Sequence, residues 1–274
     1  GTLPDHPAPD APARHEVHRP DVLVVGAGPA GAAAYEVLTA AGRQVLWVDR
    51  LDRAGLLARP PAAPEAASPE LGAHAREARL DGVLDHTGVF GAYPGERLWA
   101  AVTDVPGQAS VLRSIHPRHV VVATGSRDPT LSLPNNDRPG VVSARGLLQQ
   151  LRRSGARLQV PAVVIGDGTH AEGLARALGL ELLPSAEVER IHGNPVAGVR
   201  LRNGERECQI VALAAPPAPA FELARQAGAA VRWDGAGFAI RRDELGRCVR
   251  SESGADEPWT VWAAGDACGH LGAA

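Results

Sequence analysis

A glycine-rich turn between an apolar run and an alanine-rich stretch constrains the fold of this chain more than any other feature. Residues 22–25 are Val-Leu-Val-Val, and residues 26–31 follow as Gly-Ala-Gly-Pro-Ala-Gly. Such a continuous apolar run is typical of a strand buried on both faces of a parallel sheet. Residues 30–41 predict a helix that Gly42 ends, and residues 45–48 predict a second buried strand. Together they predict a complete βαβ unit.

The spacing of these glycines predicts a dinucleotide-binding turn. Gly26 permits the tight turn, Gly28 lets the backbone approach a pyrophosphate, and Gly31 allows close packing of helix on strand. The helix start supplies free N–H groups and a positive dipole end for the anion. Asp49, after the second strand, can accept hydrogen bonds from an adenosine ribose, and its charge argues against a 2′-phosphate. FAD, NAD and ATP all fit this reasoning. The predicted ligands of this site are Gly26, Gly28, Pro29, Ala30, Gly31, Asp49 and Arg50.

The strand–turn–helix pattern occurs twice along the chain. Residues 162–165 are apolar and lead into a second turn, Gly166-x-Gly168-x-x-Ala171, but no acidic residue closes the strand that follows it. Dense turn chemistry at residues 135–140 precedes this repeat and predicts a crossover between domains. Residues 82–107 alternate in a way that predicts a small antiparallel meander. Residues 1–20 are rich in proline and predict an extended arm outside the core.

Composition and charge exclude several classes of protein. The formal net charge is -3, so charge gives no reason to expect nucleic acid or an anionic membrane as partner. No apolar run reaches the ~20 residues that a membrane helix needs. Cys208, Cys248 and Cys268 are isolated, which predicts neither a redox dithiol nor a zinc or iron–sulfur site. A reduced, cytoplasmic protein without a metal site is the expectation.

Three segments together resemble the pyridine-nucleotide/flavin oxidoreductases that share two dinucleotide-binding domains. They are residues 21–31, residues 120–125 (Val-Val-Val-Ala-Thr-Gly) and residues 261–267 (Val-Trp-Ala-Ala-Gly-Asp-Ala). The resemblance implies that the second segment crosses near the bound nucleotide, and that the glycine-aspartate pair in the third binds the ribityl and phosphate region of a flavin. It adds Ala123, Thr124, Gly125, Gly265 and Asp266 to the expected cofactor ligands. Asp266 also has an alternative role as a turn or N-cap residue.

A narrower resemblance concerns residues 133–142, which include Asn135-Asn136-Asp137-Arg138-Pro139-Gly140, and residues 221–247. They are similar to the α subunits of heteromeric sarcosine oxidases, to related amine, proline and opine dehydrogenase subunits, and to the flavin subunit of hydrogen cyanide synthase. The resemblance implies a partner: a catalytic flavoprotein subunit in a hetero-oligomer.

Two departures from the family weaken parts of this resemblance. Where the family has a glycine-glycine-glutamine segment lining the flavin, this chain has Ala54-Gly55-Leu56-Leu57. The second turn lacks its acidic partner, so that lobe is expected to be a reduced one kept for packing. His170 and His270 are read as capping or surface residues, and no residue stands out as a general base.

The sequence therefore predicts an α/β fold of the Rossmann-like FAD/NAD(P)-binding type, with a second dinucleotide-binding domain inserted in the first. The expected boundaries are an arm at 1–20, a first domain at 21–130 with 250–274, and a second lobe at 150–249. The expected function is the FAD-holding subunit of a heteromeric, flavin-dependent amine or imino-acid dehydrogenase or oxidase. Two alternatives stay open: a scaffold subunit with a structural adenine-nucleotide site, and an NAD(P)H-dependent flavin reductase.

Overall fold

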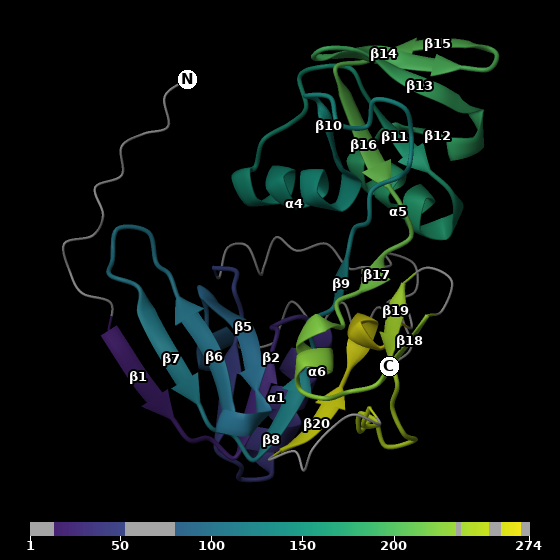
Figure 1. Cartoon of the computed structure of the whole chain (residues 1–274). Helices are drawn as coiled ribbons and strands as arrows, with labels where there is room; N and C mark the ends of the chain where they lie inside the picture. The colour runs from purple at the N-terminus through teal and green to yellow at the C-terminus, as the bar shows by residue number, and fades with distance from the viewer. Residues whose placement is uncertain (1–13, 53–79, 234–236, 252–258, 270–274) are drawn as a thin grey trace.

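The computed structural model describes residues 14–52, 80–233, 237–251 and 259–269. Figure 1 shows two groups of elements, joined by the extended segments β9 (Ser126–Arg127) and β17 (Ala218–Pro219). These two segments pair with each other antiparallel, so the chain leaves the first group and returns to it side by side.

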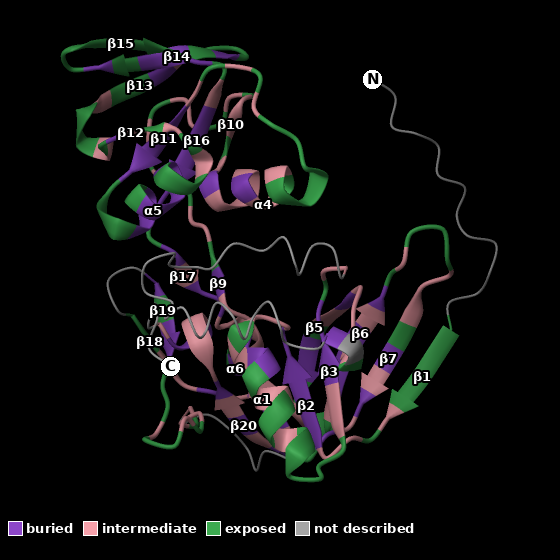
Figure 2. Cartoon of the chain, turned by 180° about the vertical axis from the view of Figure 1, so that it is seen from behind, coloured by how far each residue is buried: buried purple, intermediate pink, exposed green. Residues whose placement is uncertain are grey.

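The first group is built on a parallel five-stranded sheet with the order β20-β8-β2-β3-β4. All four pairings are parallel, and strand β2 is buried along its whole length, as its apolar run predicts (Figure 2). The strands are β2 (Val22–Val25), β3 (Val45–Val48), β4 (Val83–Leu84), β8 (His119–Val122) and β20 (Thr260–Ala263).

Helix α1 (Pro29–Ala40) connects β2 to β3 and completes the predicted βαβ unit. Proline occupies the first helical position, where its missing N–H costs no hydrogen bond. The helix buries Gly31 and Ala32 against the sheet, and Gly42, with φ +73, follows its end. Small residues on this face let the helix lie close to the strands.

An antiparallel meander packs against the other face of this sheet. It consists of β5 (Thr87–Tyr93), β6 (Leu98–Thr103) and β7 (Val111–Ile115). Strands β5 and β6 lie within the predicted residues 82–107, whereas β7 follows them. Trp99 and Ile115 of the meander share one buried cluster with Leu23 and Val122 of the parallel sheet. One buried cluster of the first group therefore lies between the two sheets, and a second one lies between the parallel sheet and α1.

Part of the predicted arm is a strand rather than a segment outside the fold. Strand β1 (Arg14–His18) pairs parallel with β7 at the edge of the meander, and Figure 2 shows it as largely exposed. Glu16 forms an ion pair with Arg113, a buried residue of β7, which explains why so polar a segment joins the sheet. Residues 1–13 of the predicted arm lie outside the described residues.

The second group has its own parallel sheet, with the order β10-β16-β11-β12. Strand β11 runs into α5 and then into β12, which repeats the strand–turn–helix pattern of the first group. A three-stranded antiparallel sheet, β13-β14-β15, follows (Figure 1). The elements are β10 (Val141–Ser143), α4 (Ala144–Ser154), β11 (Ala162–Gly166), α5 (Gly168–Leu178), β12 (Glu181–Leu183), η3 (Ser185–Glu187), β13 (Val188–Gly193), β14 (Val196–Leu201), β15 (Gly204–Glu207) and β16 (Ile210–Ala214).

The chain returns to the first group earlier than residue 249, the expected end of the second lobe. Ala224 and Ala227, at helix α6 (Glu222–Gln226), and Ile240 belong to the same buried cluster as the first sheet. Leu131 and Leu133 instead pack on the core of the second group. We therefore propose residues 131–214 as the second domain. The remaining elements are η1 (Leu80–Gly82), η2 (Pro94–Glu96), β18 (Val231–Trp233), β19 (Phe238–Ile240) and η4 (Gly265–Cys268).

Among the described residues, no helix combines the length and the apolar content that a membrane crossing requires.

Candidate functional site

The residues singled out in the sequence meet at one edge of the first sheet. Strands β2, β3, β8 and β20 are parallel, so their carboxyl ends lie at the same edge. The predicted ligands directly follow these strands: residues 26–31 after β2, residues 49–50 after β3, residues 123–125 after β8 and residues 265–266 after β20. In open α/β sheets, this edge is where nucleotides bind.

Two of the three glycines in the first turn are required by the packing of the protein itself. Gly26 has φ +108, and a Cβ added to it would lie 2.2 Å from the carbonyl oxygen of Ala123. A Cβ added to Gly31 would lie 1.9 Å from the carbonyl oxygen of Gly26. Both distances are impossible for a real side chain, so these glycines hold the turn against β8 and the start of α1 against the turn.

Gly28, by contrast, faces open space. A Cβ added to it would meet no described atom within 4 Å, and its backbone has an ordinary negative φ of -76. No described side chain caps α1 at this residue, and the first turn of the helix contains no acidic residue. The N–H groups of Ala30 and Gly31 have no acceptor within the helix, because the first N–H groups of any helix lack one. The turn thus fits a diphosphate, which needs room, free donors and a positive helix end.

Asp49 is tied to the turn by hydrogen bonds. The residue is 6% exposed, and its carboxylate accepts from the backbone N–H of Ala27 at 2.6 Å and of Leu51 at 2.8 Å. A carboxylate oxygen has more than one lone pair, so Asp49 retains capacity for a ribose hydroxyl. Its role as a ribose ligand stays a prediction. Arg50, the next residue, is exposed and lies beside Gly88 of β5.

Trp47 supports the glycine turn through a hydrogen bond to its backbone, a role that the sequence did not reveal. Its indole Nε1 donates to the carbonyl oxygen of Gly26 at 3.0 Å, and its ring stacks on Tyr35 of α1 at 4.6 Å between centroids. A buried tryptophan normally needs a hydrogen-bond partner for its N–H, and that requirement was the available signal. Only the fold shows that Gly26 is that partner.

Thr124 and Gly125 fasten β8 to the segment that returns from the second domain. The Thr124 hydroxyl donates to the carbonyl oxygen of Ala220 at 2.7 Å, and the N–H of Ala220 donates to the carbonyl oxygen of Gly125 at 2.9 Å. Gly125 has φ +72, a conformation that favours glycine. The Thr124 side chain is thus engaged with the backbone at the edge where a cofactor is expected.

Gly265 and Asp266 close the site from the side of β20. Gly265 has φ +68, and a Cβ added to it would lie 2.9 Å from the Cβ of Ala30, so η4 abuts the start of α1. The Asp266 carboxylate accepts a hydrogen bond from Ser126 Oγ at 3.3 Å. Asp266 is not an N-cap, because Ala264 is the N-cap of η4; it lies within this turn of 3-10 helix, which agrees with its alternative role as a turn residue.

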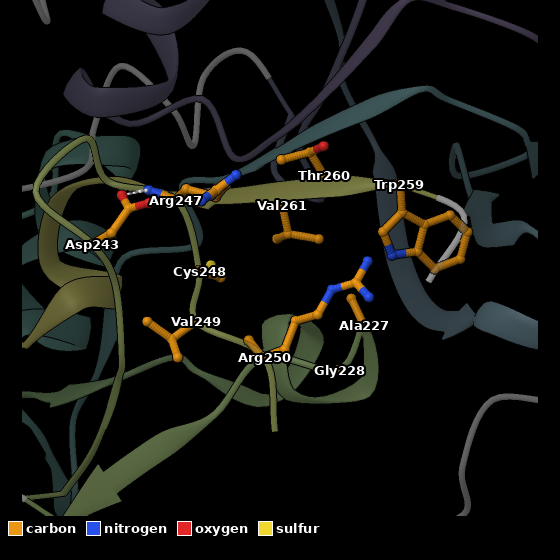
Figure 3. Close-up of a pocket in the computed structure, with 11 residues that line it drawn as sticks. Ala227, Gly228, Asp243, Arg247, Cys248, Val249, Arg250, Trp259, Thr260 and Val261 are labelled. Carbon is orange, nitrogen blue, oxygen red and sulfur yellow. Dashed lines mark hydrogen bonds and ion pairs between the residues drawn. The ribbon is translucent and has the colours of Figure 1, made fainter. Parts of the chain in front are cut away.

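A cavity of about 440 Å³ lies away from this edge, at the amino end of β20 (Figure 3). Trp259, Thr260 and Val261 border it, together with Arg247 and Arg250. None of the predicted cofactor ligands lines it. We therefore place the candidate site at the carboxyl edge of the sheet.

Comparison with known proteins agrees with this geometry. Residues 20–178, more than half of the chain, match the family model described as pyridine nucleotide-disulphide oxidoreductase. The chain belongs to this family. The predicted α/β, Rossmann-like fold is thereby confirmed, whereas the insertion of one domain in the other remains a proposal.

Curated relatives of this family member are subunits of larger enzymes. The alpha subunit of sarcosine oxidase from Corynebacterium sp. (strain U-96) is 32% identical over 158 residues, which are 50% of this chain and 16% of that protein. An opine oxidase subunit from Agrobacterium tumefaciens (strain Ach5) is 28% identical over 196 residues, which are 67% of this chain and 39% of that protein. The chain thus spans well under half the length of either relative.

Solved structures share the fold of this family member at low sequence identity. L-proline dehydrogenase from P. horikoshii superimposes with a TM-score of 0.71 at 20% identity, over 93% of this chain and 52% of that chain. Thioredoxin reductase from T. acidophilum gives a TM-score of 0.56 at 17% identity, over 91% of this chain and 90% of that chain.

The second glycine turn of this family member departs from the first. The strand register pairs Val25 with Val48 and Ile165 with Leu183, so Pro184 holds the place that Asp49 has in the first domain. The carboxylate at this end of the sheet belongs instead to Asp167, which accepts from the N–H of Ser185 at 3.1 Å. In the second domain the acidic side chain is therefore in the turn rather than at the end of the strand.

The remaining predicted features are placed as follows. His170 is buried in the first turn of α5, so the expectation that it is a surface residue is wrong. Cys208 and Cys268 are buried, and Cys248 is half-buried. Burial raises the pKa of the Cys208 thiol from 9.0 to about 11, and burial is also the main cause that raises the pKa of Cys268. The segment Ala54-Gly55-Leu56-Leu57 and His270 lie outside the described residues.

Proposed function

We propose that this chain holds FAD as the nucleotide-binding subunit of a heteromeric, flavin-dependent amine or imino-acid dehydrogenase or oxidase. The open, uncapped turn at Gly28 carries this proposal, because it offers a diphosphate both room and donors. The names of the relatives, which are subunits of sarcosine oxidase and of opine oxidase, support the choice of substrate class and of a heteromeric assembly.

In this proposal, the chain's own residues bind and orient the cofactor. The N–H groups at the start of α1 hold the diphosphate, and Asp49 fixes the turn while accepting from the adenosine ribose. Thr124, Gly125 and Gly265 shape the far side of the edge, where Asp266 faces the second half of the dinucleotide. A bound flavin would supply the electron-accepting chemistry that none of these side chains has. Oxidation of the substrate's C–N bond is assigned to the partner subunit.

The Gly28→Val variant tests the site. It places a side chain in the open space without backbone strain, so it should abolish FAD binding, measured by isothermal titration, while the thermal midpoint changes little. Gly95→Val is the matched control, because a Cβ at Gly95 also meets no described atom within 4 Å, and Gly95 lies in η2. FAD binding that survives Gly28→Val would refute the site.

The assembly is tested separately. Activity on sarcosine or proline is expected only from a preparation that contains a second, co-purified subunit. Full activity of the isolated chain would overturn the heteromeric assembly while leaving the FAD site intact.

A scaffold subunit with a structural adenine nucleotide is the second candidate. It is favoured by Asp49, whose hydrogen bonds from the N–H groups of Ala27 and Leu51 hold the proposed ribose ligand on the glycine turn. Mass spectrometry of the extracted ligand separates the two: FAD in a yellow protein supports the first proposal, and ADP or ATP in a colourless protein supports the scaffold. Pro184 argues against the third alternative, an NAD(P)H-dependent reductase, because it holds the place in the second domain that the ribose-binding Asp49 is proposed to hold in the first.

A further inference from the structure

A chain of hydrogen bonds links the cofactor edge to helix α4 of the second domain. We propose that Ser126 and Arg145 are positioning residues that orient the Asp266 carboxylate toward the cofactor. The proposal rests on the proposed function, because it needs a dinucleotide at this edge. It assigns a role to two residues that the motifs do not include.

Ser126 connects the two charged ends of this chain of hydrogen bonds. The residue is 8% exposed, its hydroxyl donates to Asp266 Oδ2 at 3.3 Å, and it accepts from Arg145 Nη1 at 3.0 Å. A hydroxyl has a single proton to donate. Because the arginine can only donate and the carboxylate accepts, the direction from Arg145 through Ser126 to Asp266 is fixed.

Arg145 is itself held firmly, which makes it a suitable anchor. Its Nη2 donates to the carbonyl oxygen of Ser126 at 2.9 Å and lies 2.6 Å from Asp128 Oδ1. The side chains of Arg145 and Asp128 are only 14% and 17% exposed. Asp128 also accepts from the hydroxyl of Ser143, which in turn caps the start of α4 by accepting from the N–H of Gly146 at 3.1 Å.

The positive charge of Arg145 is balanced within this cluster. Asp128 is the ion-pair partner of Arg145. Asp266 accepts its hydrogen bond from the Ser126 hydroxyl, which Arg145 orients, and not from Arg145 itself. An oriented neutral donor fixes a carboxylate without neutralising its charge. Because a carboxylate has about four lone-pair sites, Asp266 can accept from hydroxyl groups of a cofactor while it accepts from Ser126.

The order of the strands says which half of a dinucleotide this affects. Asp49 follows β3 on one side of the glycine turn, and Asp266 follows β20 on the other side, beyond β8. If the adenosine half lies beside Asp49, the second half extends toward Asp266. Loss of Ser126 or Arg145 should therefore lower the affinity for FAD. The affinity for ADP, which lacks the second half of the dinucleotide, should be unaffected.

Isothermal titration of the full chain with FAD and with ADP tests this prediction. Ser126→Ala and Arg145→Gln should each raise the Kd for FAD by about tenfold, the effect of losing one hydrogen bond to a charged group, and change the Kd for ADP by less than about twofold. Arg152→Gln is the matched control, because it removes the same charge from the exposed face of the same helix. Arg145→Lys, which keeps the charge, should restore part of the FAD affinity.

A double-mutant cycle separates positioning from a general structural role. In an Asp266→Asn background, Ser126→Ala should have no further effect on the Kd for FAD, because Ser126 acts through Asp266. Additive effects, equal losses for FAD and ADP, or an unchanged Kd for FAD would each overturn the proposal. If the unmodified chain binds ADP but not FAD, both the proposed function and this inference are wrong. If the unmodified chain binds FAD and the variants bind it equally well, only this inference is wrong.

Discussion

The carboxylate of Asp49 accepts a hydrogen bond of 2.6 Å from the backbone N–H of Ala27, which joins the end of strand β3 to the first glycine turn. The sequence presents Asp49 as a ligand of the nucleotide. The structure shows that it also sets the shape of the turn that is proposed to receive the nucleotide, because Ala27 lies between Gly26 and Gly28. Binding and local stability are therefore expected to be coupled at this side chain.

Asp49→Asn should lower both the stability of the chain and its affinity for the nucleotide. The amide keeps one acceptor oxygen and places an NH₂ group against one of the two backbone donors, Ala27 or Leu51. The free energy of unfolding should fall by about 1–3 kcal/mol, and the nucleotide affinity by about tenfold. Urea denaturation and FAD titration measure the two effects. Glu36→Gln on the exposed face of α1 is the control and should change neither.

Gly26 and Gly28 should respond in opposite ways to the same substitution. Gly26→Ala forces a Cβ to within 2.2 Å of the Ala123 carbonyl at φ +108, so it should destabilise the fold by several kcal/mol, on the order of 3 or more. In Gly28→Ala the added Cβ meets no described atom within 4 Å, so the thermal midpoint should stay within about 2 °C of that of the unmodified chain. The affinity for the nucleotide should fall. Equal losses of stability in the two variants would contradict the assignment of packing to one glycine and binding to the other.

The elements at the cofactor edge could be predicted because their signals are local. Short apolar runs, glycine spacing and the order of three segments are all legible within about ten residues, and the structure places these segments at one edge. The link from Ser126 to Asp266 could not be predicted, since the two residues are 140 positions apart and meet because the paired parallel strands β8 and β20, which precede them, end at the same edge of the sheet.

Strand β1 was missed for a similar reason. Proline-rich neighbours and polar residues predict an arm, whereas the ion pair between Glu16 and Arg113 joins positions 97 apart. The three-residue strands β18 and β19 are too short to show a period. Such elements depend on partners that only the tertiary fold supplies.

The second domain should bind no dinucleotide of its own. Strand β12 is followed by Pro184, which offers no carboxylate, and Asp167 is engaged with Ser185. Any NADH that binds should therefore occupy the first glycine turn, with at most one molecule per chain. Gly28→Val should abolish the binding of NADH as well as that of FAD. Equilibrium dialysis measures the stoichiometry, with Gly95→Val as control. NADH binding that persists in Gly28→Val would place a working site in the second domain.

Cys208 should make the stability of the chain depend on alkaline pH. This thiol is 2% exposed in the core of the second domain, and burial raises its pKa to about 11 from 9.0. Below about pH 9 the thiol is protonated in both the folded and the unfolded chain, so it adds no pH dependence. Between about pH 9 and 11 the unfolded chain releases the proton and the folded chain retains it, and the free energy of unfolding therefore falls as pH rises.

Urea denaturation between pH 8 and about pH 11 measures this dependence. Cys208→Ala should lose the part of the decline that the thiol causes, at the expense of a small cavity whose effect is the same at every pH. Val199→Ala, in the same buried cluster, creates a cavity without removing a titrating group, so its decline should match that of the unmodified chain. Parallel pH profiles for Cys208→Ala and the unmodified chain would show that the buried thiol does not hold its proton.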